Sequence, residues 1–300
     1  MPSGYHSRNP HNNRRGKGNL RPLLTITELQ QRVQARQNLA PHRVGHPAAG
    51  NGVARPDGTP DGSVNTSTTT PSEFSLRNKT GKILDQGQLS SCTAHAAVEG
   101  RDLLRRHLDP PLSRLYVYAG ERRRETSAGQ PLKDTGADPV DALAYMTSNG
   151  ICEESLWPYD PSQVDVDPPA NLAANAAKYK ITQSQRLNCP DILATKTMLL
   201  RGIPVMLAIA VYQSFMSAVV AQTGQISMPG CRTYWDPHDS IDPCVGGHEV
   251  LCIGYSDTTQ TLTCQNSWGP SWGDNGFFYL PYAYANNSEL IVSQCCIIQV

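Results

Sequence analysis

The stretch that decides the fold reads Asp85-Gln86-Gly87-Gln88-Leu89-Ser90-Ser91-Cys92-Thr93-Ala94, a turn-rich approach that ends in a single cysteine. Apolar residues then recur at helical spacing as far as Leu108, which predicts a helix that ends before Asp109-Pro110-Pro111, because proline breaks helices. Cys92 would lie in its first turn, where unpaired N–H groups and the helix dipole favour a thiolate. A lone cysteine is more often a small buried apolar residue, so a nucleophile needs a partner base.

Composition limits the classes of function. The chain has 300 residues, no net charge and 39% hydrophobic residues, enough for one large domain or two smaller ones with a sizeable core. There is no basic excess of the kind that points to nucleic acid. The longest apolar run, Val205–Tyr212, is too short to cross a membrane, and the polar start predicts that no secretory signal peptide is present. We therefore expect neither nucleic acid nor a membrane as a partner.

The cysteines favour a reducing compartment. Nine is an odd number, so at least one has no partner within the chain, although Cys231 and Cys244 could pair. No CxxC pair occurs, so we expect no structural zinc, and nothing in the sequence indicates another metal or a cofactor. Mostly buried free thiols are the simplest interpretation, which slightly favours an intracellular location and otherwise leaves the compartment open.

Residues 1–72 differ in composition from the rest of the chain. Both ends of this segment are poor in apolar residues, so they cannot offset chain entropy and are predicted to be disordered. Between them, Thr25 and Glu28 have capping-box spacing, and one short helix over 25–39 is expected. The basic start could contact acidic surfaces or nucleic acid, but a solvated tail is the more ordinary interpretation. The compact domain is predicted over 73–300.

Within that domain, helices come first and strands follow. Residues 112–118 form a buried segment of helix or strand, and 160–173 read as a loop. Further helices are predicted over Asp138–Asn149, with Asp138 as the cap and Pro139 in the first turn, and over Asp191–Arg201. Strands are predicted at 205–212, 249–255, 261–265, 277–280 and 291–299, with a hairpin connection at 256–260. The order indicates an α+β architecture with two lobes of different character.

A cysteine nucleophile needs a general base and a group that orients it. Most of the histidines lie in the tail, on a polar helix face or in an acidic loop. His95 could lie near Cys92, but it also fits a packed helix side chain. His248 follows Gly246-Gly247 and opens the strand 249–255, so it is held on rigid structure. Across the predicted hairpin, the Asn266 amide could accept from one imidazole nitrogen and leave the other facing the thiol.

These residues resemble the motifs of a papain-like cysteine peptidase over residues 72–300. Residues 85–92 are similar to the family's approach to its nucleophile, and Gly246-Gly247-His248-Glu249-Val250 to its histidine strand. The run from Asn266-Ser267-Trp268-Gly269 to Phe277 is similar to its asparagine segment and is the most specific of the three. Asp134-Thr135-Gly136-Ala137 and Leu156-Trp157-Pro158-Tyr159 are weaker matches, the latter typical of divergent non-animal members.

The resemblance implies a two-lobed fold, with a helical left lobe, an antiparallel β-barrel-like right lobe and the active-site cleft between them. It implies that Cys92 attacks the scissile carbonyl, that His248 accepts and later returns the proton, and that Asn266 orients the ring. Trp268 would shield that hydrogen bond, and Gln86 with the Cys92 N–H would form the oxyanion hole. The substrate-binding residues implied are Gly136, Ala137, Gly247 and Trp268.

Four positions depart from the family pattern. Leu89 replaces a cysteine that forms a disulfide in most relatives, and Thr93 replaces a tryptophan. His95 occupies a position that is usually aromatic and apolar. Glu249 occupies a position where a small residue is usual, and an inward-pointing carboxylate would need a partner, because burying it alone is costly.

The sequence thus predicts a thiol-dependent endopeptidase acting on peptide or protein substrates, monomeric by default. Two alternatives remain open: a catalytically silent relative that binds peptides or proteins, and an acyl transferase that uses the same triad. The change in composition before the peptidase match suggests an inhibitory leader, as in a zymogen, although a flexible tether or localisation tail would look the same.

Overall fold

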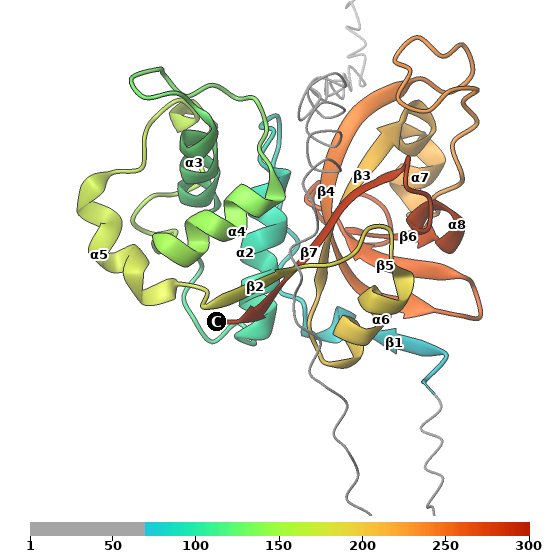
Figure 1. The fold of residues 1–300 in the computed structure, drawn as a ribbon, viewed down its shortest axis with the longest axis horizontal. Coiled ribbons are helices and arrows are strands. Elements are labelled where there is room, and N and C mark those ends of the chain that lie inside the picture. Colours follow the sequence, from blue (N-terminus) through green and yellow to red (C-terminus); the bar gives the residue numbers. More distant parts are fainter. Residues whose placement is uncertain (1–69) are drawn as a thin grey trace, which may run out of the picture.

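The computed structural model describes residues 70–300. The helix expected over 25–39 and nearly all of the predicted tail lie outside the described residues, so the boundary at residue 72 stays a prediction. Figure 1 shows a helical half beside a half built on a twisted sheet. The helical half contains α2 (Cys92–Leu104), α3 (Arg114–Glu125), α4 (Pro139–Ser148) and the short α5 (Ala173–Ala176). This is the α+β, two-part architecture that the sequence predicts.

Local sequence explains where the helices begin. Helix α2 starts at Cys92 as predicted, but it ends at Leu104, and Leu108, placed by the sequence on its apolar face, lies beyond the helix and is 77% exposed. The segment 112–118, for which the sequence allowed a helix or a strand, contains the start of helix α3. The Ser113 side chain caps this helix by accepting from the Tyr116 N–H. Asp138 caps α4 by accepting from the Val140 N–H, with Pro139 in the first turn, as predicted.

The other half is a 7-stranded antiparallel sheet in the order β2-β7-β3-β4-β5-β6, with β1 (Glu73–Ser75) paired to β4. Strands β3 (Val205–Tyr212), β5 (Thr261–Gln265) and β7 (Ile291–Gln299) have the predicted bounds. The remaining strands are β2 (Gln183–Arg186), β4 (Cys244–Ser256) and β6 (Phe277–Pro281). Helix α6 (Ile192–Leu200) lies where predicted, whereas β1, β2, α7 (Ala218–Thr223) and α8 (Tyr282–Ala285) were not predicted.

One predicted boundary is wrong in a way that affects the site. Strand β4 begins at Cys244, so His248 lies inside the strand, paired with Ile209, and does not open it. The reason is that β3 is long enough to pair with the glycines as well: Ala210 pairs with Gly247 and Val211 with Gly246. The ladder with β3 therefore extends along the chain both before and after His248.

Helix α2 is the element shared by both halves. It packs on β4, and an added Cβ at Gly100 would lie 3.3 Å from Leu251 Cδ1, so the two backbones are close. The main hydrophobic core runs from α2 through the sheet, while a smaller core inside the helical half contains Leu89, Tyr116 and Trp157. Leu89, the departure from a family cysteine, is thus a core side chain there.

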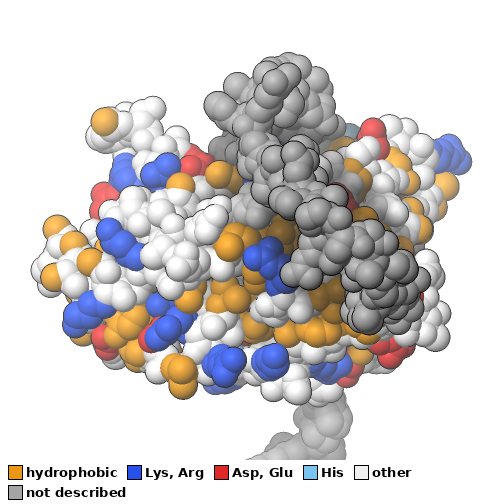
Figure 2. Space-filling view, turned by 60° about the horizontal axis from the view of Figure 1, so that its bottom comes forward, with side chains coloured by type: hydrophobic (Ala, Val, Ile, Leu, Met, Phe, Trp, Pro, Cys, Tyr) orange, Lys and Arg blue, Asp and Glu red, His pale blue; other side chains and the backbone are white. Residues whose placement is uncertain are grey.

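The surface carries mixed charge. Figure 2 shows Lys and Arg side chains scattered over one face of the molecule, with acidic side chains among them and hydrophobic ones gathered toward its middle. No helix in the described residues has the length and apolar character needed to cross a membrane.

Candidate active site

Cys92 is the first residue of α2 and is completely buried. Its sulfur accepts a hydrogen bond of 3.1 Å from the Glu249 backbone N–H, which joins the start of the helix to β4. Burial above all, and then the carboxyl groups of Glu249 and Glu121, raise the pKa of the Cys92 thiol well above its usual value. This direction is opposite to the expectation that the helix start favours a thiolate, and the burial of the thiol is its largest cause.

His248 and Asn266 form the predicted pair. The Ser267 N–H donates to Asn266 Oδ1 at 2.8 Å, which identifies that atom as the acceptor, and His248 Nε2 donates to it at 2.7 Å. The proton on Nε2 leaves Nδ1 with a lone pair, as a general base requires. The Trp268 ring stacks on the imidazole with centroids 4.8 Å apart and an interplanar angle of 26°, so it covers the ring.

The imidazole is a weak base in this environment. Burial lowers the pKa of His248 to about 4, and the hydrogen bond to Asn266 offsets part of that shift. Among the described residues, the Cys92 sulfur accepts a hydrogen bond from the Glu249 N–H, and no hydrogen bond links the thiol to the His248 ring. At neutral pH both groups are uncharged, so an attack by sulfur requires proton transfer to the ring as the new bond forms.

Hydrogen bonds fix both the backbone and the side-chain amide of Gln86. Its backbone N–H donates to the Ser267 carbonyl at 2.8 Å, and its side-chain Oε1 accepts from Ser267 Oγ at 2.5 Å. Nε2 donates to the Leu89 carbonyl at 2.7 Å, and because a primary amide has two N–H groups, one remains for a ligand. Gly87, with a φ of 59°, makes the turn that places this amide before α2.

Two residues that sequence reasoning missed support this arrangement, Ser267 and Tyr159. The Tyr159 hydroxyl donates to the Gln86 carbonyl at 2.9 Å and shares a hydrogen bond of 2.6 Å with the Ser91 hydroxyl. It therefore ties the residue before the nucleophile to the proposed oxyanion donor. The resemblance of the Leu156–Tyr159 segment to the family marked this tyrosine, although its partners could not be read from the sequence.

Of the predicted substrate-binding residues, Gly136 and Ala137 lie in the loop between α3 and α4, and Gly247 lies in β4. Asp134 Oδ1 accepts from the Ser90 N–H at 3.0 Å and from the Tyr118 hydroxyl, which in turn accepts from the Gly136 N–H at 3.1 Å. Gly136, with a φ of 72°, therefore lies beside the loop of the nucleophile. Ala137 is buried, and Gly247 is a partly exposed residue of β4 next to His248.

His95 is a packed helix side chain. Its Nδ1 donates to the Ser91 carbonyl at 2.9 Å, and its ring meets Tyr159 edge-on with centroids 5.0 Å apart. Burial, followed by the charge of Arg114, lowers the pKa of His95 to about 3. Of the two interpretations that the sequence allowed, the structure favours the structural one.

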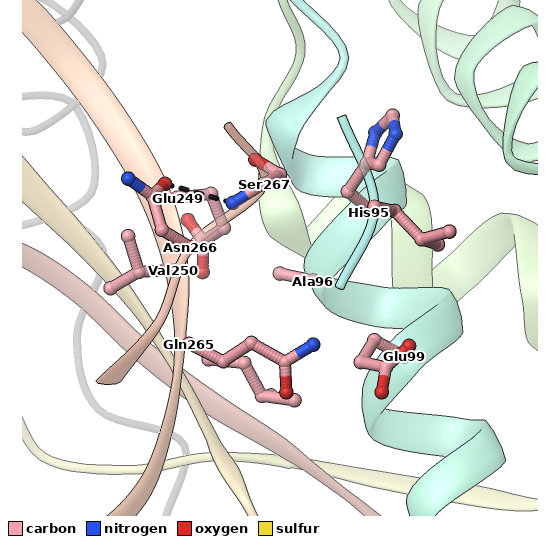
Figure 3. Close-up of a pocket in the computed structure, with 10 residues that line it drawn as sticks. His95, Ala96, Glu99, Glu249, Val250, Gln265, Asn266 and Ser267 are labelled. Atoms are coloured by element: carbon pink, nitrogen blue, oxygen red, sulfur yellow. Dashed lines mark hydrogen bonds between the residues drawn. The ribbon is translucent and has the colours of Figure 1, made fainter. Parts of the chain in front are cut away.

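Acidic groups surround the nucleophile. Thr93 donates to Glu121 Oε1 at 2.7 Å, whereas Glu121 Oε2 and both carboxylate oxygens of Glu249 have no hydrogen-bond partner. Glu249 also lines a cavity of about 20 Å³ between the sheet and α2, together with Gln265 and Asn266. Figure 3 shows the Gln265 amide reaching from β5 across this space toward Glu99 of α2. The described residues contain no cluster of three or more His, Cys, Asp or Glu side chains suited to a metal ion.

The sequence matches known proteins over this whole region. The model of the papain family cysteine proteases matches residues 70–298. An uncharacterized peptidase C1-like protein of Acanthamoeba polyphaga mimivirus is 33% identical over 220 residues, which cover 69% of this chain and 66% of that protein. Cysteine proteinase 3 of Entamoeba histolytica is 26% identical over 217 residues, or 70% and 62% of the two chains. The match thus spans somewhat less than two thirds of the length of these curated relatives.

Solved structures agree with this assignment. Xylellain, a cysteine protease from Xylella fastidiosa, matches with a TM-score of 0.66 at 30% identity, over 78% of this chain and 88% of that one. A digestive procathepsin L 3 of the Tenebrio molitor larval midgut matches with a TM-score of 0.59 at 20% identity, over 77% and 71%, and shows the same fold. The described chain therefore has the papain-like fold and belongs to the papain family of cysteine proteases.

Proposed function

We propose that the protein is an active endopeptidase that cleaves peptide bonds with Cys92 as nucleophile. The observation that carries the proposal is the His248–Asn266 hydrogen bond of 2.7 Å, which the Trp268 ring covers. The residue after His248, Glu249, contacts the Cys92 sulfur through its backbone N–H. A base with an orienting group and a buried thiol at a helix start form the set of groups that nucleophilic cysteine catalysis needs.

The reaction follows from the positions of these groups. His248 Nδ1 takes the proton of the Cys92 thiol while sulfur forms a bond to the scissile carbonyl carbon, and the carbonyl oxygen becomes an oxyanion. The free N–H of Gln86 Nε2 and the backbone N–H of Cys92 donate to that oxygen. The C–N bond then breaks, and the imidazolium gives its proton to the leaving amine. Water, activated by the neutral His248, hydrolyses the thioester and restores the thiol.

The retention of all four groups speaks against a silent relative. A protein that only binds peptides has no chemical need for Cys92, His248, Asn266 and Gln86 together. The fixed Gln86 amide is the strongest sign, because holding it through Ser267 and Leu89 serves no packing purpose that an apolar side chain would not serve better.

Labelling with an epoxide or vinyl-sulfone reagent tests the proposal. The full chain is expected to react at one thiol and to cleave peptides, and Cys92→Ala should abolish both. Cys152→Ala is the matched control, because Cys152 is also a buried free thiol but lies in the smaller core of the helical half. Labelling that persists in Cys92→Ala, or absent peptide cleavage by a protein that is labelled at Cys92, would contradict an endopeptidase.

A further inference from the structure

Glu249 is a buried acid without a partner. Its side chain belongs to a residue that is 2% exposed, and neither carboxylate oxygen has a hydrogen bond. Glu121 is completely buried and leaves Oε2 unpartnered as well. Burying such groups without donors costs several kcal/mol, so a chain that keeps two of them together requires a reason.

The register of the sheet places Ser293 on the same face as Glu249. Glu249 of β4 pairs with Ala208 of β3, and Ala208 pairs with Ser293 of β7. Residues directly opposite each other point to the same face of a sheet, so the three side chains share one face. Ser293 Oγ is also buried and unpartnered. Three acceptor oxygens and a hydroxyl therefore have unused capacity in this region.

The same face has little side-chain bulk near Glu249. Ala208 is the only residue of β3 that is not fully buried, and Gly247, two residues before Glu249 and hence on the same face, is also partly exposed. A methyl group and a hydrogen atom are thus all that β3 and β4 place beside the carboxylate at these two positions. A substrate side chain could approach over them.

This acidic region adjoins the nucleophile on two sides. The Glu249 N–H donates to Cys92 Sγ at 3.1 Å, and Glu121 accepts from Thr93, the residue after Cys92. An extended chain advances about 3.3 Å per residue, so a side chain that meets Glu249 belongs to a residue within about two positions of the scissile bond. Cys92 and Glu249 are both buried, and they lie side by side at the contact of α2 with β4.

No basic group of the described chain forms an ion pair with these acids. The ion pairs of the described residues involve other carboxylates, and neither Glu249 nor Glu121 is among them, although the charge of Arg122 opposes part of the rise in the pKa of Glu121. Burial, and then the charge of Glu121, raise the pKa of Glu249 well above its usual value, a shift that an incoming cation opposes. A positive charge supplied from outside the described chain would be the partner that Glu249 lacks.

We propose that Glu249, assisted by Glu121 and Ser293, binds a lysine or arginine side chain of the peptide substrate next to the scissile bond. The inference rests on the proposed peptidase function and assigns it a substrate class. A guanidinium has five donors and an ammonium three, enough for the unpartnered oxygens. Attraction is strong here because the region excludes water. Glu249 is thus a specificity-determining residue.

Cleavage of matched peptides tests this inference. The full chain is given peptides that carry arginine, its uncharged isostere citrulline, or glutamate at each of the two positions on either side of the bond. We expect kcat/KM to be about tenfold or more higher for arginine than for citrulline at one position. In Glu249→Gln the ratio of the two kcat/KM values should fall to about one, whatever the variant does to the absolute rate of cleavage. Glu99→Gln is the control, because it removes a carboxylate that lines the same cavity from α2.

Binding separates this inference from the proposed function. Cys92→Ala protein is titrated with the same arginine and citrulline peptides, so that the site is read without catalysis. Cys92-dependent cleavage with no preference for arginine, or a preference that survives in Glu249→Gln, overturns the basic site and leaves the peptidase standing. Tighter binding of arginine peptides that depends on Glu249, together with no cleavage by the full chain that keeps Cys92, supports the site and overturns the peptidase. Equal binding of arginine and citrulline peptides overturns the site.

Discussion

Ser267 binds Gln86 twice. Its carbonyl accepts from the Gln86 backbone N–H at 2.8 Å, and its hydroxyl donates to Gln86 Oε1 at 2.5 Å. Gln86 precedes α2 and Ser267 follows β5, so these bonds join the two halves of the molecule. Asn266, the preceding residue, holds His248. One short segment therefore positions both the proposed oxyanion donor and the proposed base.

Ser267→Ala tests that relationship. Without the hydroxyl, the Gln86 amide loses the bond that fixes Oε1, so its remaining N–H points less reliably at the oxyanion. We expect kcat to fall by about tenfold with little change in KM, and stability to fall by about 1 kcal/mol. Steady-state kinetics and chemical denaturation measure the two effects. Ser256→Ala removes an exposed hydroxyl that bonds to Glu73 and should change neither; an unchanged kcat in Ser267→Ala would contradict the role.

Gln86→Ala should have the larger effect, because it removes the donor itself. Loss of one oxyanion-hole donor costs about 10²–10³ in kcat. Gln88→Ala serves as the control, since Gln88 is an exposed glutamine in the same loop. If both variants lose activity equally, the loop as a whole and not the amide is responsible. The rate of Cys92 alkylation should be less affected than kcat, because alkylation forms no oxyanion.

Glu249→Gln should shift the ionisation of the Cys92 thiol. Burial is the main reason for the raised pKa of this thiol, and the Glu249 carboxylate is the next, since a negative charge beside sulfur disfavours the thiolate. Removing it lowers the pKa, so the pH profile of Cys92 alkylation should move to lower pH. Glu99→Gln should leave the profile in place. A shift to higher pH would show that Glu249 is neutral and donates to the thiolate.

Protonation of His95 should destabilise the fold. Its pKa is about 3 in the folded protein and 6.5 in the unfolded chain, so the unfolded state binds more protons between these values. Its contribution is complete above pH 6.5 and is lost as pH falls toward 3, by about 5 kcal/mol at most. The buried carboxyls have the opposite dependence, so the difference between wild type and His95→Gln is the quantity to measure.

Urea denaturation at several pH values gives that difference. Stability of His95→Gln should decline less steeply than that of wild type from pH 6.5 downward. His107→Gln is the control, because His107 is exposed. Parallel stability curves for wild type and His95→Gln would mean that His95 remains unprotonated in the unfolded chain or titrates normally in the folded one, and would refute the prediction.

Deletion of residues 1–70 tests the leader hypothesis, which concerns a segment almost wholly outside the described residues. If part of that segment inhibits the enzyme, the shortened protein should hydrolyse peptides faster per labelled Cys92 than the full chain. Equal activity of the two forms would reject inhibition and favour a tether or localisation role. Counting labelled sites corrects for any protein that fails to fold.

Sequence patterns predicted those features that depend on neighbouring residues. The cap at Asp138 with Pro139 after it defines α4, and apolar or alternating runs predicted the bounds of β3, β5 and β7. The pairing of His248 with Asn266 was accessible because His248 lies in β4 and Asn266 directly follows β5, and a hairpin joins these two strands. Local spacing is sufficient for such features.

Features set by distant contacts could not be predicted. Ser267 lies 181 residues from Gln86 in the sequence, and Tyr159 lies 73 residues from it. No local sequence pattern therefore predicts the hydrogen bonds of these two residues to Gln86. The raised pKa of the Cys92 thiol could not be predicted for the same reason. The helix start is visible in the sequence, but the burial of the thiol depends on β4 and α3. His248 was placed at the strand's opening because the extent of β3 opposite the glycines is also a property of the fold.

Gly100 sets how closely the helix of the nucleophile can lie on the strand of the base. With no side chain there, α2 rests almost directly on Leu251, and an added methyl group would act as a spacer 3.3 Å from it. Gly100 is about two helical turns from Cys92, so a side chain there would require either the Leu251 side chain or the helix of the nucleophile to move by a few tenths of an ångström. A glycine remote from the reaction thus contributes to the spacing between the helix of the nucleophile and the strand of the base.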